Sequence, residues 1–599
     1  MNVDTKVDLK YEFIETQDGL EKIIEELENQ SIIGLDTEAT KFDPFTAKLL
    51  LIQLATNDNV FVIDTTKVDI SPIKHILESD RPLKLVQNAK FDYNLLKVQA
   101  GISLGALFDT MIAERILTMG ISREISLKVL AEKYLGMIID KSVRETFIDQ
   151  SFGSSIREFS TEQLEYSARD AFVLRGIFEK QFKKLQEEEL INTAKLEFSV
   201  IPAVANMELY GSLIDKIKWR KYIAELREKR DASNKEIQND LRHLSPYSQV
   251  DLFGNETDTI NLDSPLQVLE VFKKLGEELP NTAEATLKKT KHPLANKLLE
   301  YRAYEKMITS FGESILQKIH PLTGRLHPDF IQLGADTGRF ACNNPNLQQI
   351  PADSGFRSCF IASPGYKLIT ADYSQIELRI MAEVSGDPAF LKAFHEDVDL
   401  HTLTASQMFR IPIEKVNKDK RFQAKSINFG LMYGRGPASL ANQLGVSVDE
   451  SKKLLEIYFS KYKKVKNWLD AVGRQTLRQG YVRTLGGRKR KFNLPDKSDM
   501  DYTKIISSIE RQGKNMPIQG TSADITKFAL LFIYREIGKA KLDAHLVHTV
   551  HDEIVVEAKS EIADDTAKMV EEQMIKAGEK LLKKVPVRVD VHVSNCWEK

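Results

Sequence analysis

The sequence predicts a large multidomain protein that joins an α/β unit to an α+β unit. Short apolar segments typical of strands open the chain, a long stretch with charged helical periodicity follows, and apolar strands return near the carboxyl end. The length of 599 residues corresponds to about three or four domains of ordinary size. A chain of this length can bury a sizeable core in each domain.

The composition is that of a globular protein outside the membrane. Hydrophobic residues make up 42% and charged residues 28%, and no apolar run approaches the length of a membrane span. The three cysteines are scattered without a C-x-x-C pair, which argues against disulfides or a cysteine zinc site and favours a reducing compartment. The charged amino terminus lacks the apolar core of a signal peptide. The net charge of −2 predicts that any surface for a polyanion is local, and residues 486–492 and 288–292 are the densest basic clusters.

Residues 31–40, 48–56 and 59–64 predict three successive strands of a mixed sheet. Asp36 and Glu38 stand two residues apart in the first of these, so both carboxylates point to one face at the end of the strand. Adjacent anions repel each other unless a cation joins them. The alternative is a polar strand end that runs into a turn.

Two later segments supply further carboxylates. Residues 84–96 predict a strand, a turn and a helix with Asp92 in its first turn. Residues 161–178 predict a helix opened by Thr161, with Tyr166 and Asp170 four apart on one face. Each of these features alone is more often structural than catalytic.

The ordered set of D-x-E, N-x-x-x-D and Y-x-x-x-D resembles the three motifs of the DEDDy 3′–5′ exonucleases, which have a ribonuclease H-like fold. The resemblance covers about residues 10 to 190 and implies an exonuclease domain over residues 1–195. It implies that Asp36, Glu38, Asp92 and Asp170 ligate two divalent metal ions, and that Tyr166 orients the attacking water. Two ions about 4 Å apart stabilise both oxygens of an in-line displacement, and oxygen ligands suit Mg²⁺ or Mn²⁺. All five positions are filled, so an active nuclease is expected.

A second pattern is a row of two cations and two rings, Arg421, Lys425, Phe429 and Tyr433, at a strict spacing of four. On a helix these side chains share one stripe. Cations at one end and rings at the other suit a nucleotide, with phosphates at one end and a flat base at the other. The alternative is a half-buried helix whose Arg and Lys side chains extend their charged ends to solvent.

Two aspartates are predicted at strand tips. Residues 366–386 predict a strand that ends at Asp372 and a helix from about residue 374. Residues 544–558 predict a hairpin with Asp552 at its tip, where V-H-D-E replaces the usual Asn-Gly or Asp-Gly. The sequence therefore predicts that Asp372 and Asp552 bind two Mg²⁺ ions, while the cations of the row hold a nucleotide triphosphate.

DYSQIELR, RFQAKSINFGLMYG and VHDE, preceded by TGRF and NPNLQQIP, closely resemble motifs A, B and C of the family A DNA polymerases, the bacterial DNA polymerase I group. The resemblance covers nearly all of residues 200 to 599 and implies a right-hand fold with palm, fingers and thumb over residues 196–599. The implied boundaries are thumb about 215–325, palm about 326–390 and 500–599, and fingers about 391–499.

The resemblance also implies a role for each residue in these motifs. Asp372 and Asp552 would be the metal ligands, with Glu553 near the primer end. Glu377, packed beside Tyr433, would exclude a ribose 2′-hydroxyl, and Phe429 is the ring that disfavours dideoxynucleotides. The other implied nucleotide contacts are Arg421, Lys425, Gln375 and His401; the implied DNA contacts are Arg339 and Gln519 in the minor groove, with Arg511, Asn515 and His551 nearby. The basic cluster at Lys288 would contact phosphates from the thumb.

The expected function is template-directed addition of dNTPs to a primer 3′ end, with two Mg²⁺ ions per active site, replaceable by Mn²⁺, and with 3′–5′ proofreading. The expected partners are primer–template DNA and dNTPs, without a membrane, and the expected state is a monomer. The expected location is the cytoplasm, associated with the nucleoid, for a bacterial or phage chain, and an organelle matrix or stroma for a processed eukaryotic chain. The chain begins almost directly with the exonuclease, so removal of flaps or RNA primers is expected to need another protein.

Two other functions remain open from the sequence. A single-subunit RNA polymerase shares the strand-tip aspartates, but Glu377 and the proofreading motifs oppose it. An exonuclease that uses the carboxyl-terminal part only to hold nucleic acid is opposed by the retained aspartates, since binding alone needs no metal carboxylates.

Overall fold

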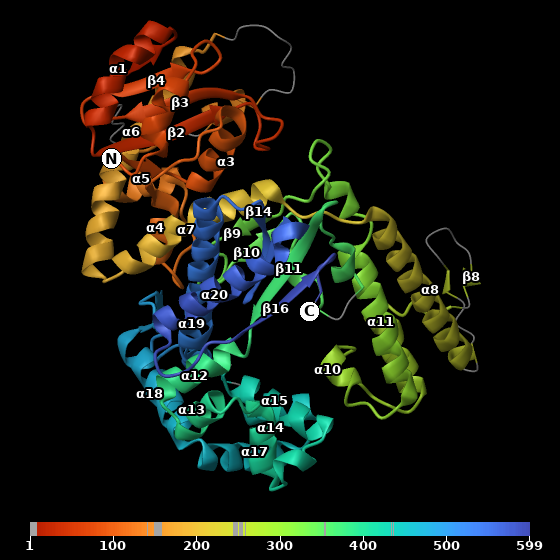
Figure 1. Ribbon diagram of the computed structural model, residues 1–599. Coiled ribbons are helices and arrows are strands. Elements are labelled where there is room, and N and C mark those ends of the chain that lie inside the picture. The colour runs from red at the N-terminus through yellow and green to blue at the C-terminus, as the bar shows by residue number, and fades with distance from the viewer. Residues whose placement is uncertain are drawn as a thin grey trace.

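A computed structural model describes residues 9–140, 142–148, 158–242, 249–250, 256–257, 259–352, 355–432, 434 and 436–598. Side chains are described for all of these except residues 249–250, 256–257, 429 and 431–432. In Figure 1 an amino-terminal unit lies at the top, a second sheet occupies the centre, a helical lobe lies below it and a helical arm extends to the right.

The amino-terminal unit is built on a six-stranded mixed sheet with the order β1-β4-β3-β2-β5-β6. β3 runs antiparallel to β2 and β4, whereas the other neighbouring pairs are parallel. The strands are β1 (Glu12–Ile14), β2 (Ile32–Ala39), β3 (Leu49–Ala55), β4 (Val60–Asp64), β5 (Leu83–Val86) and β6 (Leu107–Asp109). The helices around it are α1 (Gln17–Asn29), α2 (Lys74–Glu78), α3 (Ala89–Ala100), α4 (Thr110–Leu117), α5 (Leu127–Leu135) and α6 (Thr161–Glu187). The three predicted strands and the mixed sheet are confirmed.

Helix α6 begins at Thr161, as predicted, and its cap is the preceding residue. Ser160, not Thr161, is the N-cap: its side chain accepts a hydrogen bond from the Gln163 backbone, and the Gln163 side chain returns to the Ser160 N–H. This capping box satisfies two backbone donors at once, whereas a cap at Thr161 would have Leu164 at the third helical position and lose the reciprocal bond.

Helix α7 (Ile191–Tyr210) joins the amino-terminal unit to the rest of the chain. It packs against α3 on one side and against β14 and α19 on the other, so it is buried along most of its length. Lys90 of α3 strengthens this junction, because its ammonium lies 2.6 Å from carboxylate oxygens of both Glu208 and Asp329. A cavity of about 830 Å³ lies beside these contacts.

The arm is a pair of long helices, α8 (Lys216–Leu241) and α11 (Pro293–Phe311), closed at its far end by α9 (Pro265–Lys274) and α10 (Glu284–Leu287). Two short strands, β7 (Gln249–Val250) and β8 (Glu256–Thr257), also lie at this end. The far end has its own apolar core around Phe272 and Leu298. The predicted helical arm is confirmed, with α8 ending at Leu241.

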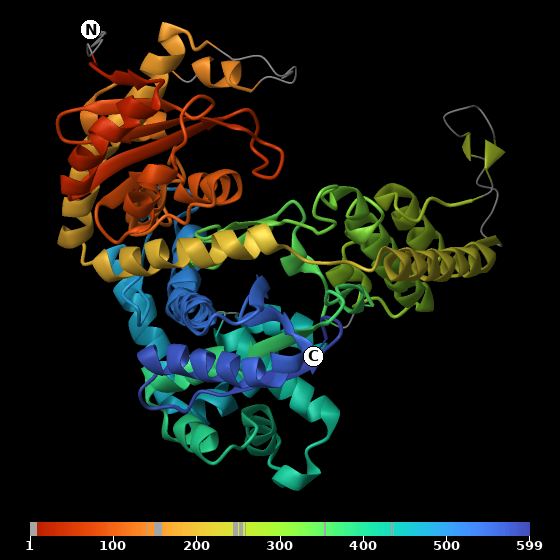
Figure 2. The ribbon, with the colours of Figure 1, turned by 45° about the horizontal axis from the view of Figure 1, so that its top comes forward.

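The central sheet has four strands in the order β14-β15-β11-β16, all antiparallel. Its strands are β11 (Tyr366–Tyr373), β14 (Ala544–Val550), β15 (Glu553–Lys559) and β16 (Val589–Ser594). Helices α12 (Ile376–Ser385), α19 (Tyr502–Ala540) and α20 (Ala563–Leu581) pack around it, and Figure 2 shows α7 crossing above this layer. The predicted strand, helix and hairpin are confirmed here.

The lower lobe is helical. It contains α13 (Pro388–His395), α14 (Leu400–Phe409), α15 (Lys418–Met432), α16 (Pro437–Leu444), α17 (Val448–Lys461) and α18 (Lys463–Gln479). The hairpins β9 (Asp329–Ile331) with β10 (Ala341–Asn343) and β12 (Tyr481–Arg483) with β13 (Lys489–Lys491) flank the central region. Across the described parts of the chain, no helix combines the length and apolarity that a membrane crossing needs.

Candidate active sites

The two strand-tip aspartates meet in the central sheet. Asp372 is the penultimate residue of β11 and lies directly opposite Glu553, the residue after Asp552. The Tyr373 N–H donates to the Asp552 carbonyl at 3.4 Å. His551 adopts φ 57°, a left-handed conformation that closes the tight turn between β14 and β15. The structure therefore places these two predicted ligands side by side.

The electrostatics of this pair suit a cation. Burial and, second, the Asp372 carboxylate raise the pKa of Asp552 to about 7. Two half-buried or buried carboxylates that repel each other are the environment that a divalent ion relieves, and hard carboxylate oxygens suit Mg²⁺ or Mn²⁺. The residues present therefore fit the expected ions.

Glu553 has a different environment from the two aspartates. Its carboxylate is buried, both of its oxygens lie 3.1 Å from Nη1 of Arg357, and it accepts a hydrogen bond of 2.6 Å from the Trp597 indole. The Arg357 guanidinium also stacks over the Trp597 ring at 4.1 Å. Glu553 therefore anchors the hairpin that carries Asp552, and its predicted place near the primer end stays a prediction.

The predicted ribose gate and a predicted minor-groove contact are joined to each other. Glu377 lies in the first turn of α12, is 6% exposed, and accepts a hydrogen bond of 2.5 Å from Nη2 of Arg339. Gln375 precedes it with φ 53°, in the left-handed region. Tyr433, the expected neighbour of Glu377, lies outside the described residues, so its predicted packing stays a prediction.

Helix α15 carries the predicted phosphate-binding cations. The Arg421 guanidinium forms two contacts with Asp399, from Nε at 2.8 Å and from Nη2 at 3.2 Å, and Lys425 follows one turn later. Asp399 also caps α14 by accepting from the Thr402 N–H. Asp399 therefore holds the guanidinium in place. The side chain of Phe429 lies outside the described part of the structure.

His401, a predicted nucleotide contact, is buried in the structure. It is 3% exposed between α14 and α15, its ring contacts the Asn428 amide at 3.0 Å, and burial lowers its pKa to about 4. A neutral imidazole inside a helix pair supports the packing, and the predicted contact of His401 with a nucleotide stays a prediction.

The remaining predicted DNA contacts lie together on α19. Arg511, Asn515 and Gln519 are spaced four apart along this helix. Gly434, just past α15, approaches Arg511 so closely that an added Cβ would lie 2.8 Å from its Cγ. His551, the other predicted DNA contact, lies in the turn between β14 and β15, and burial and then Arg339 lower its pKa.

The amino-terminal sheet carries a second acidic site. Carboxylate oxygens of Asp36, Glu38 and Asp170 all lie within 4.8 Å of one another, which fits a divalent cation. They line a cavity of about 390 Å³ together with Tyr166. Burial and then Asp170 raise the pKa of Tyr166, so its phenol is neutral.

Asp92 lines the same cavity but is not part of the three-carboxylate cluster. It is buried at 2% exposure and accepts a hydrogen bond of 2.6 Å from Thr37. Burial raises its pKa to about 7. Of the four predicted carboxylates, three therefore lie close together, and the fourth, Asp92, is bound by the Thr37 hydroxyl.

The cavity also has two basic residues that the sequence patterns did not identify, Lys128 and Arg144. The Arg144 guanidinium lies over the Phe42 ring at 5.1 Å. Neither residue belongs to a motif of recognisable spacing, so only the fold could bring them to the carboxylates.

The basic cluster at residues 486–492 makes polar contacts within the protein. Lys489 and Lys491 pair with Glu188 at 2.9 and 2.8 Å, and Arg490 donates to Gln512. Arg488 is fully buried. Positive charges of this cluster are therefore balanced within the protein. The cluster at Lys288 stays exposed, where Lys288 pairs with Glu284.

Two acidic sites, one on a mixed sheet and one at a hairpin tip, are typical of an enzyme that performs metal-dependent phosphoryl transfer at two places. Residues 220–599 match the family model "DNA polymerase family A", and residues 11–186 match the model "3'-5' exonuclease". The chain belongs to DNA polymerase family A and carries a 3′–5′ exonuclease domain. The predicted family, fold class and enzyme class are confirmed.

Individual relatives agree with this assignment. The chain is 33% identical to DNA polymerase I of Aquifex aeolicus, covering 99% of this chain and 100% of the relative. It is 31% identical to DNA polymerase I of Pseudomonas aeruginosa, covering 99% of this chain but 66% of that protein, so it spans about two thirds of this relative's length. Among solved structures, the POL domain of Pol1 from M. smegmatis, in complex with DNA primer-template and dNTP, has 27% identity and a TM-score of 0.84, covering 98% of this chain and 99% of that one.

Proposed function

We propose that this chain extends a primer 3′ end with dNTPs on a DNA template and removes mismatched ends at a separate exonuclease site. The observation that carries the proposal is the meeting of Asp372 and Asp552 at one sheet edge in a family A chain, where Arg421 and Lys425 follow on α15. The proposed domains are those expected from the sequence, with the exonuclease over residues 1–195 and thumb, palm and fingers over residues 196–599. One chain supplies both sites, so a monomer suffices.

In the polymerase site, Asp372 and Asp552 would hold divalent cations, Mg²⁺ in this proposal, which neutralise the charge that develops on the transferring phosphoryl group. Arg421 and Lys425 bind the triphosphate and orient its leaving pyrophosphate. Glu553, fixed by Arg357, keeps the hairpin rigid so that the Asp552 carboxylate does not have to be ordered at the moment of reaction. Glu377 occupies the space that a ribose 2′-hydroxyl would need.

In the exonuclease site, Asp36, Glu38 and Asp170 would hold the cation that activates water. Tyr166, neutral at physiological pH, can accept or donate a hydrogen bond and so orient that water. Arg144 and Lys128 lie at the same cavity, where they can bind the phosphates of a single strand.

Primer extension by the wild-type chain tests the proposal. On a 5′-labelled primer–template with Mg²⁺ we expect elongation with dNTPs, little elongation with NTPs, and shortening when nucleotides are left out. EDTA should stop both reactions, because both sites depend on carboxylate-bound cations. Shortening without any elongation would support the exonuclease-only function instead, and equal use of NTPs would support an RNA polymerase.

Phe429→Tyr should admit dideoxynucleotides, as expected from the position of this ring in motif B. We expect the ratio of ddNTP to dNTP incorporation to rise at least about tenfold, since a tyrosine hydroxyl can replace the hydrogen bond that the missing 3′-hydroxyl would make. The measurement is chain termination at a fixed ddNTP to dNTP ratio. Phe422→Tyr, on the same helix with a ring 61% exposed, is the matched control and should leave the ratio unchanged. Unchanged termination by Phe429→Tyr would contradict the prediction.

A further inference from the structure

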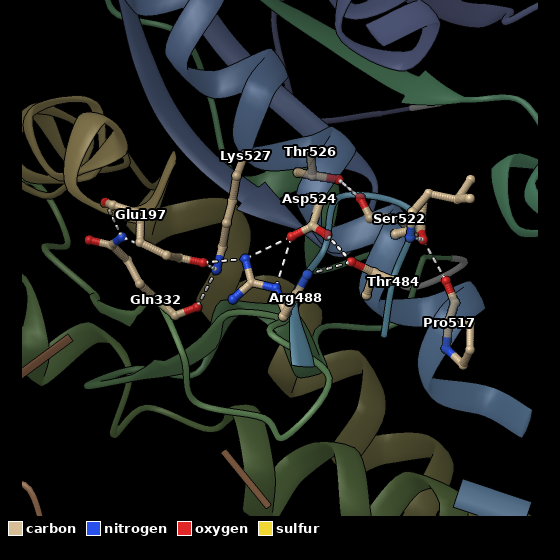
Figure 3. A network of polar contacts seen from close by, with 11 residues as sticks. Glu197, Gln332, Thr484, Arg488, Pro517, Ser522, Asp524, Thr526 and Lys527 are labelled. Carbon is tan, nitrogen blue, oxygen red and sulfur yellow. Dashed lines mark hydrogen bonds and ion pairs between the residues drawn. The ribbon is translucent and has the colours of Figure 1, made fainter. Parts of the chain in front are cut away.

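The buried arginine of the basic segment 486–492 is the centre of a charged network. The Arg488 Nε donates to Asp524 at 2.8 Å, and its Nη2 pairs with both Asp524 and Glu197. Lys527 also pairs with Glu197 and donates to the Gln332 carbonyl at 2.8 Å. Figure 3 shows these side chains converging: Glu197 comes from α7, Arg488 from the residue before β13, and Asp524 and Lys527 from α19. The charges of Arg488 and Lys527 balance those of Glu197 and Asp524. A buried network in which every charge is paired holds its side chains in one geometry.

The turn that carries Arg339 rests directly on this guanidinium. Gly338 has φ +85°, and a Cβ added there would lie 2.6 Å from Nε of Arg488. The turn is closed by the Gly338 N–H, which donates to the Ala335 carbonyl at 2.9 Å, and by the Ala335 N–H, which donates to the Arg339 carbonyl at 3.2 Å. Only glycine combines this backbone conformation with so close an approach.

Helix α19 closes the same unit from the other side. A Cβ added at Gly520 would lie 2.5 Å from Cγ2 of Thr484 and 3.0 Å from the Thr337 carbonyl. The Thr484 hydroxyl donates to Asp524 at 2.7 Å and accepts from the Arg488 N–H at 3.1 Å. Gln519 is the residue before Gly520, so the helix backbone that carries Gln519 lies against the turn that carries Arg339.

We infer that Arg488 and Asp524 are positioning residues that set the relative placement of Arg339 and Gln519. This inference rests on the proposed function. Every correct base pair presents acceptors at equivalent places in the minor groove, purine N3 and pyrimidine O2, so two donors at a fixed separation test the shape of a pair without reading its sequence. A displacement of about 1 Å can cost a reaction about 100-fold, which makes the rigidity of the unit a requirement for this test.

Two primers test whether a donor of the protein binds the minor-groove N3 of the primer end: one ends in dG, and the other ends in 3-deaza-dG, which lacks that acceptor. The quantity measured is the ratio of their extension rates, dG primer over analogue. For the wild type we expect the single-turnover extension rate to fall about 10- to 100-fold with the analogue, since a hydrogen bond to a charged donor is lost. In Gly338→Ala the added Cβ displaces the turn, so the natural primer should slow to about the analogue's rate and the ratio should fall to within about twofold. Arg488→Lys keeps the buried charge but loses the second arm of the guanidinium, and should lower the ratio in the same direction.

Gly365→Ala is the matched control. Gly365 has φ +84°, nearly the value at Gly338, but no atom lies within 4 Å of a Cβ added there. Gly365→Ala should keep the wild-type ratio of extension rates with the two primers and should lower only the free energy of unfolding. Equal slowing of both primers in Gly338→Ala and Arg488→Lys, with an unchanged ratio, would assign the network to stability alone and overturn the inference. Failure of the wild type to extend the natural primer would instead overturn the proposed function.

Discussion

Asp372→Asn is expected to lower primer extension at least about 10³-fold while primer shortening continues at the wild-type rate. The carboxylate pair of Asp372 and Asp552 is the place where charge is neutralised in the proposed polymerase reaction, and removing one ligand costs about 4 kcal/mol of transition-state stabilisation, or about 10³-fold. The asparagine keeps the size of the side chain, and Asp372 is half-buried at a strand end, so the sheet should stay intact. The measurement is single-nucleotide addition under single-turnover conditions.

Asp543→Asn provides the control for that experiment. Asp543 lies just before β14, at the opposite end of the same sheet, where it accepts a hydrogen bond from the Tyr366 hydroxyl. The same substitution there should leave extension within about twofold of the wild type, because surface substitutions rarely change stability by more than about 0.5 kcal/mol. A normal extension rate in Asp372→Asn would contradict the assignment of the polymerase site to Asp372 and Asp552.

Much of the candidate site could be predicted because its residues lie at strand and helix ends with regular spacing. The period of two along β2 placed Asp36 and Glu38 on one face, and the apolar run of β11 placed Asp372 at its tip. The unusual turn V-H-D-E marked Asp552. These patterns are local, so the placement of the side chains follows directly once the strand or helix forms as predicted.

The sequence patterns did not find contacts in which a side chain's partner comes from a distant part of the chain. Lys489 and Lys491 find Glu188 about 300 residues away in sequence, and Glu553 finds Arg357 and Trp597. No pattern within the segment 486–492 distinguishes a basic cluster that binds phosphate from one that binds carboxylates of its own protein. His401 and Asp92 show the same limit, because their burial depends on elements that meet only in the folded chain.

Asp36→Asn is expected to have the opposite effect to the substitution at Asp372: shortening should fall at least about 10³-fold, and extension of a matched primer should be unchanged. The reason is geometric. Asp36, Glu38 and Asp170 form a cluster in the amino-terminal unit, whose main apolar core is distinct from that of the central sheet, with α7 contributing to both cores. Shortening of a single-stranded 5′-labelled oligonucleotide measures the first rate, and extension in the presence of all four dNTPs measures the second.

The same variant tests whether the two sites share one primer end. With a mismatched primer terminus, the wild type should remove the mismatch before extending, whereas Asp36→Asn should stall or extend the mismatch directly. Asp58→Asn, in the exposed turn between β3 and β4 of the same sheet, should behave as the wild type. If Asp36→Asn still corrected the mismatch, another group would have to hydrolyse the primer end, and the three-carboxylate cluster would lose its assigned role. Loss of both activities in Asp36→Asn would mean that the amino-terminal unit is needed for the fold of the whole chain, because Asp36 lines a different cavity from Asp372.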